Sequence, residues 1–225
     1  NESLHWMTQV LEDVLPSEMH GRVCALGGPS FAREVAAGMP SAVCLASRDH
    51  AVARIAQEQL AGERFRVYTT EDVVGVEIGG ALKNVMAIAA GAADGLGFGH
   101  NARAALITRG LAEMARLGQA LGANPLTLAG LSGLGDLVLT CTGDLSRNRR
   151  VGLEMGSGRT LTEVLADMRM VAEGVRTAKS AYDLAKREQV EMPITTEVYL
   201  ALYEGKPPIE AVTSLLSRTL RSERD

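Results

Sequence analysis

Lys83 is the side chain whose surroundings in the sequence most strongly suggest chemistry. It stands beside Asn84 in a stretch, residues 78–93, that is otherwise apolar on every side. Such a segment is typical of a helix buried in a core, and buried lysines act as general bases or Schiff-base nucleophiles. The alternative is that Lys83 lies at the edge of the apolar surface and extends its ammonium group into water. The residues alone leave both interpretations open, although Gly79 and Gly80 would allow a backbone or a ligand to come close.

Asp136 and the segment from Ser146 to Asn148 are further candidates. Asp136 follows three glycines in GLSGLGDL, where the backbone could approach a ligand; the alternative is an ordinary turn residue. Ser146, Arg147 and Asn148 place a hydroxyl, a guanidinium and an amide in a row where we expect a helix to begin. This combination suits a phosphate dianion, which binds arginine in a bidentate manner and accepts hydrogen bonds from helix N-terminal N–H groups. The alternative is a solvated basic helix face.

Two weaker candidates lie outside these segments. The turn Gly28-Pro29-Ser30 joins a predicted strand to a predicted helix, and ligands of open α/β sheets bind at the carboxyl ends of strands. An ordinary turn in which serine caps the helix would give the same sequence. Glu173, in the segment VAEG, could also face a ligand, but a glutamate at the start of a helix is common because it interacts favourably with the helix dipole.

The composition limits the class of protein. The 225 residues suit one large domain or two small ones, and a hydrophobic content of 46% is ample for a packed core. A net charge of −4 argues against a general nucleic-acid-binding protein. Cys24, Cys44 and Cys141 form no C-x-x-C motif and the four histidines are isolated, so we expect neither a metal site nor a disulfide framework. Residues 78–93 are fewer than the ~20 of a membrane-spanning helix, so we expect no insertion there.

Strand and helix signals alternate in the first 70 residues. This alternation indicates a mostly parallel α/β sheet, and three strands are few for a doubly wound domain. We therefore expect residues 1–70 to be the C-terminal part of a dinucleotide-binding α/β domain, a remnant of a doubly wound, Rossmann-like sheet. The predicted strands are 22–27, 41–46 and 64–68, and the predicted helices are 4–15, 31–37, which Ser30 would cap, and 49–60.

After Thr70 the strand signals end, and residues 71–225 are predicted to form an all-α substrate or catalytic domain. No G-x-G-x-x-G motif occurs in the chain, so the chain by itself does not encode the phosphate-binding loop of a dinucleotide-binding domain. The predicted helices are 73–93, 102–121 with Asn101 as N-cap, one that begins with a capping box of Thr160 and Glu163, and then 173–189, 193–204 and one from 208 onward.

Several segments together carry a resemblance to a known family. They are, in chain order, GGPSFAREV, VYTTEDVVGVEIGGALKNVMAIAAGAADGLGFGHNARAALITRGLAEM, GLSGLGDLVLTCT, SRN and VAEG. This set resembles the bacterial NAD(P)-dependent glycerol-3-phosphate dehydrogenases, over essentially the whole chain. The upstream nucleotide-binding half of that family, with its glycine-rich loop and a further substrate-contacting lysine, has no counterpart here. The chain therefore looks like a truncated form, which we expect to be inactive on its own.

The resemblance implies a role for each matching residue. Lys83 would be the general base that takes the proton of the C2 hydroxyl, or returns it to the carbonyl in the reverse direction. Asn84 and Thr140 would orient the reacting centre. The substrate would contact Gly28, Ser30, Lys83, Asp136, Ser146, Arg147 and Asn148, with Arg147 and Asn148 on the phosphate. The cofactor would contact Ala32, Arg147, Val171 and Glu173.

The resemblance also implies the reaction and its partners. The enzyme would interconvert sn-glycerol 3-phosphate and dihydroxyacetone phosphate by hydride transfer to or from NAD or NADP, and so supply glycerophospholipid synthesis in the cytoplasm. The partner would be a small phosphorylated three-carbon substrate, with no nucleic acid and no membrane insertion, and a homodimer is common in the family. Two alternatives stay open: a lysine-dependent β-hydroxyacid dehydrogenase, and a non-catalytic helical module that serves dimerisation.

Overall fold

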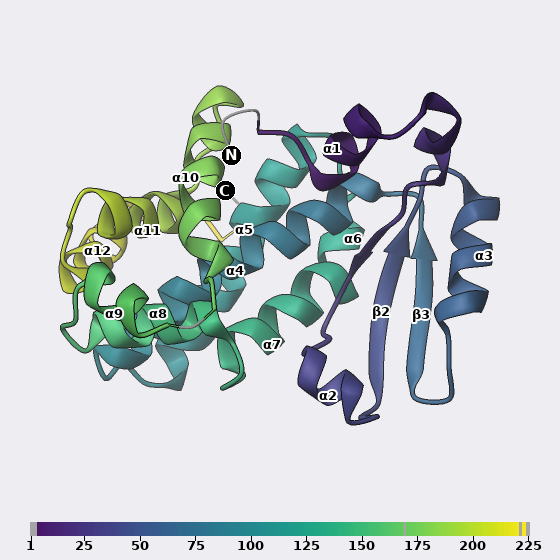
Figure 1. Cartoon of the computed structure of the whole chain (residues 1–225). Coiled ribbons are helices and arrows are strands. Elements are labelled where there is room, and N and C mark those ends of the chain that lie inside the picture. Colours follow the sequence, from purple (N-terminus) through teal and green to yellow (C-terminus); the bar gives the residue numbers. More distant parts are fainter. Residues whose placement is uncertain (1–3, 169, 221, 224–225) are drawn as a thin grey trace.

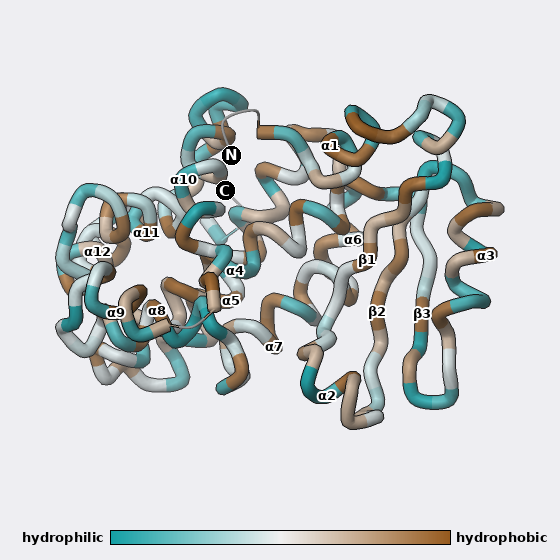
Figure 2. The backbone as a smooth tube through the Cα atoms, in the orientation of Figure 1, coloured by the Kyte–Doolittle hydropathy of each residue, from teal (hydrophilic) through white to brown (hydrophobic). Residues whose placement is uncertain are grey.

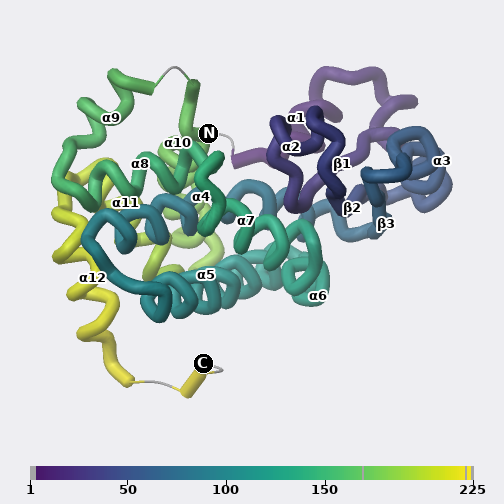
Figure 3. The backbone as a smooth tube through the Cα atoms, turned by 90° about the horizontal axis from the view of Figure 1, so that it is seen from below, coloured from purple at the N-terminus to yellow at the C-terminus, as the bar shows by residue number. Residues whose placement is uncertain are grey.

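The computed structural model describes residues 4–168, 170–220 and 222–223. A small sheet with short helices around it lies on one side of the molecule, and a larger helical part lies on the other (Figure 1). Helix α4 (Val73–Gly95) follows the last strand directly and runs into the middle of the helical part. Seen from below, most of the segment up to β3 lies beside the helical part (Figure 3), whereas Leu4 and Trp6 at its start pack against the core of that part.

The sheet has the order β1 (Ala25–Gly27), β2 (Ser41–Ala46), β3 (Phe65–Thr70). Strand β2 pairs with β3 in parallel, as expected, but β1 pairs with β2 antiparallel, so the prediction of a mostly parallel sheet was wrong for β1. The reason is the connection between β1 and β2. Its one helix, α2 (Ala32–Ala36), spans about 7.5 Å, whereas a parallel crossover must return along a strand of about 20 Å.

The sheet has its own small core. Val43 and Leu45 of β2 and Val67 of β3 pack against Ala53 of α3 (His50–Leu60). The hydrophobic colouring of β2 and the hydrophilic loop before β3 agree with this arrangement (Figure 2). The remaining elements before α4 are α1 (Met7–Val14) and a 3-10 turn (Ser17–Arg22).

Three predicted helix caps can be compared with the structure. The capping box is confirmed at α9 (Leu161–Asp167), where the Thr160 hydroxyl accepts from the Glu163 N–H and the Glu163 carboxylate accepts from the Thr160 N–H. Ser30 is not a cap, because its hydroxyl donates to the carbonyl of Gly28 instead. Asn101 is not a cap either: α5 (His100–Ala120) begins one residue earlier, after an extended Gly99.

Helix α4 is the centre of the helical part. Of its 23 residues 13 are buried, and its neighbours in the fold include helices from every later part of the chain. Asp72 caps its N-terminus by accepting from the Gly75 N–H. The helices around it are α5, α6 (Pro125–Leu128), α7 (Asp136–Thr142), α8 (Arg147–Gly156), α9, α10 (Glu173–Arg187), α11 (Pro193–Tyr203) and α12 (Pro208–Leu216), with a π-helical turn, η2 (Leu131–Gly135), before α7.

Within the part of the chain that the structure describes, two stretches are long and apolar enough to cross a membrane by length and composition alone: Val73–Gly95 and Pro125–Thr142. The first is α4, and 61% of an apolar 18-residue segment of this helix is buried inside the protein. This is the pattern of the core helix of a packed helical domain.

Glycines allow α8 to touch α4 backbone to backbone. A Cβ added at Gly91 of α4 would overlap the carbonyl of Arg149, and one added at Gly152 of α8 would overlap the carbonyl of Ile88. Gly95 and Gly156, one turn farther along, meet the facing backbone in the same way. The position of α8 on α4 is therefore set by main-chain contact and leaves no room for side chains between the two helices.

We expect Gly152→Ala to destabilise the protein, because the new methyl group must push α8 away from the carbonyl of Ile88. Overpacking of this kind costs on the order of 1–3 kcal/mol or more. Gly80→Ala is the matched control, because nothing lies within 4 Å of a Cβ at Gly80. There, alanine should stabilise α4 by about 0.5–1 kcal/mol. Urea denaturation measures both changes, and equal free energies of unfolding would contradict this account of the crossing.

Glu113 is a buried carboxyl group on α5. It accepts hydrogen bonds from the N–H of Ile194 (2.6 Å) and the N–H of Thr195 (3.1 Å), and thereby caps α11. Burial nevertheless raises the pKa of Glu113 from 4.5 to about 7. The native state therefore binds this proton more tightly than the unfolded state does, so the stabilisation from the proton is full below pH 4.5 and is lost as the pH rises towards 7.

We expect Glu113→Gln to flatten the pH dependence of stability. Relative to the variant, the unsubstituted chain should lose up to about 3 kcal/mol of unfolding free energy between pH 4.5 and pH 7. Urea denaturation of both proteins at several pH values checks this, because all other titrating groups are common to the two. Parallel pH curves would show that burial does not hold the Glu113 proton.

Candidate active site

Lys83 ends in an ion pair with Asp136. Its Nζ lies 2.5 Å from Oδ2 of the aspartate; 22% of the lysine side chain is exposed, compared with 4% of the aspartate. The lysine projects from the middle of α4, and Asp136 is the first residue of α7. Lys83 is therefore neither enclosed in the apolar core nor free in water: its ammonium group reaches the surface at a fixed carboxylate.

A π-helical turn brings Asp136 to the lysine. In η2 the N–H of Gly135 donates to the carbonyl of Gly130, and the turn packs on α4 where a Cβ at Gly79 would overlap the Ser132 carbonyl. The close approach predicted at the glycine pair of α4 is thus correct for Gly79 only, because Gly80 faces open space. Of the glycines before Asp136, Gly133 lies directly against the Leu128 backbone.

The Asp136 carboxylate has two further partners. The backbone N–H of Gly28 donates to Oδ2 at 3.4 Å, and the Thr140 hydroxyl lies 3.3 Å from Oδ1 while it also donates to the Asp136 carbonyl at 2.6 Å. Gly28 has a φ of +131° and sits against the backbone of Val43, so this turn position needs glycine. The structure therefore brings Gly28, Lys83, Asp136 and Thr140 together, with the carboxylate at the centre.

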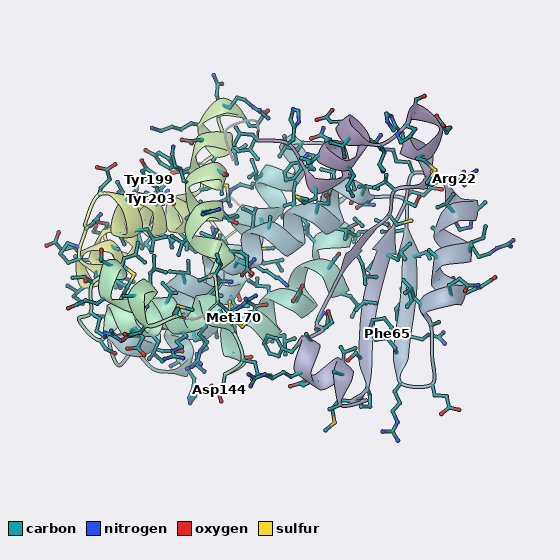
Figure 4. All side chains as sticks on the ribbon, in the orientation of Figure 1. Arg22, Phe65, Asp144, Met170, Tyr199 and Tyr203 are labelled. Carbon is teal, nitrogen blue, oxygen red and sulfur yellow. The ribbon has the colours of Figure 1, made fainter. Side chains whose placement is uncertain are left out.

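A second cluster forms where α8 meets the start of α10. Ser146 caps α8 by accepting from the Arg149 N–H, as expected for a helix that begins here. The buried Asn148 side chain accepts from the N–H of Gly174 (2.9 Å). Arg147 pairs with Glu173 at 2.7 Å on the surface, with 38% and 50% of the two side chains exposed. Asp144 and Met170, labelled in Figure 4, mark the loops on either side of this cluster.

Asn84 connects the two clusters. It follows Lys83 on α4, and its backbone carbonyl lies so close to Gly174 that a Cβ there would be 2.7 Å from it. The Asn148 side-chain oxygen lies on the same glycine, 2.8 Å from that Cβ position. The Asn84 side chain itself donates only weakly, to the carbonyl of Gly80 at 3.4 Å. The start of α10 thus rests on the residue next to the lysine.

The remaining candidates lie at the edges of this arrangement. Ser30 is exposed beside Gly28, to whose carbonyl it donates at 3.0 Å. Ala32 is exposed at the start of α2, and Val171 is exposed just before α10. Among the described residues, no group of three or more histidine, cysteine, aspartate or glutamate side chains could hold a metal ion.

Sequence reasoning missed one set of charges near the site. Asp94, at the end of α4, binds the guanidinium groups of Arg103 and Arg149. It does not partner Lys83, because the spacing of eleven residues separates the two side chains by about 16 Å along the helix. Its partners lie on α5 and α8. In the sequence, the pairing could have been suspected from an acidic residue at the end of an apolar helix, followed by two arginines.

Comparison with known proteins identifies the family. Residues 72–213 match the family described as NAD-dependent glycerol-3-phosphate dehydrogenase C-terminus, and residues 1–53 match the corresponding N-terminus. The chain belongs to this family. Membership and the small sheet joined to helices confirm the predicted fold class, a remnant of a doubly wound α/β sheet followed by an all-α domain. The division into residues 1–70 and 71–225 stays a prediction.

Individual glycerol-3-phosphate dehydrogenases are similar over nearly the whole chain. Proteins named glycerol-3-phosphate dehydrogenase [NAD(P)+] from Geobacter sp. (strain M21) and Geobacter sulfurreducens are 60% and 62% identical, each over 99% of this chain and over 66% and 67% of their own length. The crystal structure of the Coxiella burnetii glycerol-3-phosphate dehydrogenase has 48% identity and a TM-score of 0.85, over 87% of this chain and 60% of that one. The chain thus spans about two thirds of the length of its curated relatives.

The two neighbouring residues Arg147 and Asn148 should differ in their effect on stability. Asn148→Ala leaves the buried Gly174 N–H without an acceptor and should cost on the order of 1–3 kcal/mol. Arg147→Ala removes an exposed ion pair and should cost less than about 1 kcal/mol. Urea denaturation of both variants checks the difference. If the arginine variant were the less stable of the two, the assignment of Asn148 as the structural link to α10 would be wrong.

Proposed function

We propose that this chain supplies the proton-transfer and substrate-binding groups of an enzyme that interconverts sn-glycerol 3-phosphate and dihydroxyacetone phosphate with NAD or NADP. The observation that carries the proposal is the Lys83–Asp136 ion pair, partly open to solvent and joined through Asn84 to the cluster of Arg147 and Asn148. An acid–base group thus lies near an arginine at a helix N-terminus, as a small phosphorylated alcohol or ketone requires.

Lys83 would move the proton at the C2 oxygen. The Asp136 carboxylate, 2.5 Å from Nζ, fixes the position of the lysine side chain, and from there Lys83 would donate a proton to the carbonyl oxygen when dihydroxyacetone phosphate is reduced. In the opposite direction, the neutral amine would take the proton of the C2 hydroxyl. The N–H of Gly28 and the Thr140 hydroxyl would hold the Asp136 carboxylate in place while Lys83 gains or loses its proton.

Arg147 would bind the substrate phosphate. Its present partner, Glu173, is half exposed, and such surface pairs contribute about 0–1 kcal/mol. A phosphate dianion offers the guanidinium a stronger, bidentate interaction, so Arg147 can exchange Glu173 for substrate at little cost. Asn148 and Ser146 fix the helix turn from which the arginine projects.

The nicotinamide cofactor would supply the hydride donor or acceptor. The groups that this chain offers to it are Ala32, Val171 and the Arg147–Glu173 pair, all of which are exposed and accessible. The chain has no G-x-G-x-x-G phosphate loop, so these residues would contact the cofactor without supplying such a loop for its pyrophosphate. We expect the isolated chain to be inactive for this reason, and NAD and NADP are both compatible with the residues present.

The proposal includes the biological setting of the enzyme. The activity would supply glycerol 3-phosphate to glycerophospholipid synthesis in the cytoplasm, without nucleic-acid binding or membrane insertion and with homodimer formation. Membership of the glycerol-3-phosphate dehydrogenase family replaces the alternative of a β-hydroxyacid dehydrogenase. A non-catalytic helical module is the alternative that the experiment below separates from the enzyme.

The test adds the part of the relatives' length that this chain does not span. In a chimera, the N-terminal third of the Geobacter sulfurreducens relative, 62% identical over the shared region, precedes this chain, and oxidation of NADH by dihydroxyacetone phosphate is followed. Lys83→Met keeps the apolar stem and should lower kcat by about 10²–10⁴-fold, the usual contribution of general acid–base catalysis. The midpoint of thermal unfolding is measured in parallel.

Lys179→Met is the matched control, because Lys179 is an exposed lysine that also pairs with an aspartate, Asp183. It should leave kcat unchanged. A folded Lys83→Met chimera with near-normal kcat would remove Lys83 from the mechanism. A folded chimera with no activity before any substitution would favour the non-catalytic module.

A further inference from the structure

Asp94 lies outside the candidate active site, yet it is one of the most enclosed charges near it, with 7% of its side chain exposed. Oδ1 accepts from Nε and Nη2 of Arg103, at 2.9 and 2.6 Å. Oδ2 accepts from Nε of Arg149 at 3.0 Å and lies 2.8 Å from Nη2 of the same residue. One carboxylate on α4 therefore holds a guanidinium from α5 and another from α8. Both of its oxygens are fully used, which leaves Asp94 no capacity to bind a ligand itself.

Arg149 connects Asp94 to the first turn of α8, to which it belongs. Its backbone N–H is the one that Ser146 caps, at 3.2 Å, and its Nη1 also reaches Asp144 in the preceding loop, at 3.1 Å. Its carbonyl rests on Gly91, where α4 has no side chain. Backbone and side chain of Arg149 are thus both fixed to α4. Arg147, proposed to bind the phosphate, and Asn148, which fixes the turn from which Arg147 projects, are the two residues immediately before it.

The attachment lies on the same side of α4 as the lysine. Asp94 follows Lys83 by eleven residues, which at 100° per residue returns to nearly the same face, about 16 Å along the axis. Gly91, three residues before Asp94, belongs to that face too. Helix α4 therefore carries the proton-transfer group near its middle and the attachment of the phosphate-binding turn near its end.

We propose that Asp94 is a positioning residue of this site: through Arg149 it holds the turn Ser146–Asn148 at a fixed place relative to Lys83, so that both groups meet one substrate. This inference rests on the proposed function. Without the carboxylate, the two guanidinium groups would repel each other, and the exposed Asp144 would attract Arg149 away from α4. The first turn of α8 would then shift towards the loop that precedes it.

The experiment uses the chain as it stands, with glycerol 3-phosphate as the probe. In 1H–15N NMR spectra, Asp94→Asn should shift the Gly174 backbone amide and the Asn148 side-chain amide, which share a hydrogen bond. The same variant should bind glycerol 3-phosphate about tenfold more weakly or worse, since misplacement by about 1 Å has effects of this size or larger. Asp94→Glu keeps the charge; it should fold and recover most of the affinity, which protects the test against an unfolded asparagine variant.

Glu154→Gln is the matched control. Glu154 lies on α8 as well and pairs with Arg159 at 3.3 Å, but at the far end of the helix. It should leave the two amide signals and the affinity unchanged. The proposal is overturned if folded Asp94→Asn keeps both signals and the affinity of the unsubstituted chain, or if Glu154→Gln reproduces its effects. If the unsubstituted chain binds no glycerol 3-phosphate, the proposed function fails at its phosphate site, whereas the amide signals still decide whether Asp94 holds the turn.

Discussion

Main-chain contact with α4 is the constraint on which the rest of this structure depends. At Gly79 the π-helical turn, and at Gly91 the first turn of α8, occupy the space that a side chain would fill. The turn delivers Asp136 and α8 delivers Arg147, so the two halves of the candidate site are located by glycines that take no part in its chemistry. Protein interiors are close-packed and yield little. A side chain at Gly79 or Gly91 would keep Lys83 on the helix but would push the π-helical turn or α8 away from it.

The ion pairs around the candidate site differ in their exposure to solvent. Asp136 with Lys83 and Asp94 with its arginines are largely shielded from water, and removal of one partner from such a pair is costly because the other charge stays buried. Arg147 and Glu173 are exposed, and their attraction is weak in water and screened by salt. The shielded pairs of Asp136 and Asp94 keep the site rigid, whereas the exposed pair of Arg147 and Glu173 lies at the place proposed for the phosphate.

Local signals in the sequence predicted most of the elements but not their partners. The apolar run and the Thr160–Glu163 box gave α4 and the start of α9 because both depend on neighbours within a few residues. Asn101 failed as a cap because Gly99 starts the helix earlier, a choice that depends on the turn before it. The pairing of Lys83 with Asp136, 53 residues away, depends on a π-helical turn that no periodicity signals. Candidate residues could therefore be named from sequence, whereas their geometry could not.

Asp136 also decides how the two parts of the molecule cooperate. Its carboxylate is the acceptor for Lys83 from the helical part and for the Gly28 N–H from the end of β1. The turn at Gly28 passes close to the Val43 backbone of β2, with a φ of +131° that favours glycine. A displacement of the sheet relative to α7 would therefore change the hydrogen bonding of the same carboxylate that pairs with Lys83. Lys83, the proposed proton-transfer group, is thus coupled through one side chain to the part of the fold that, in a complete doubly wound domain, carries the dinucleotide.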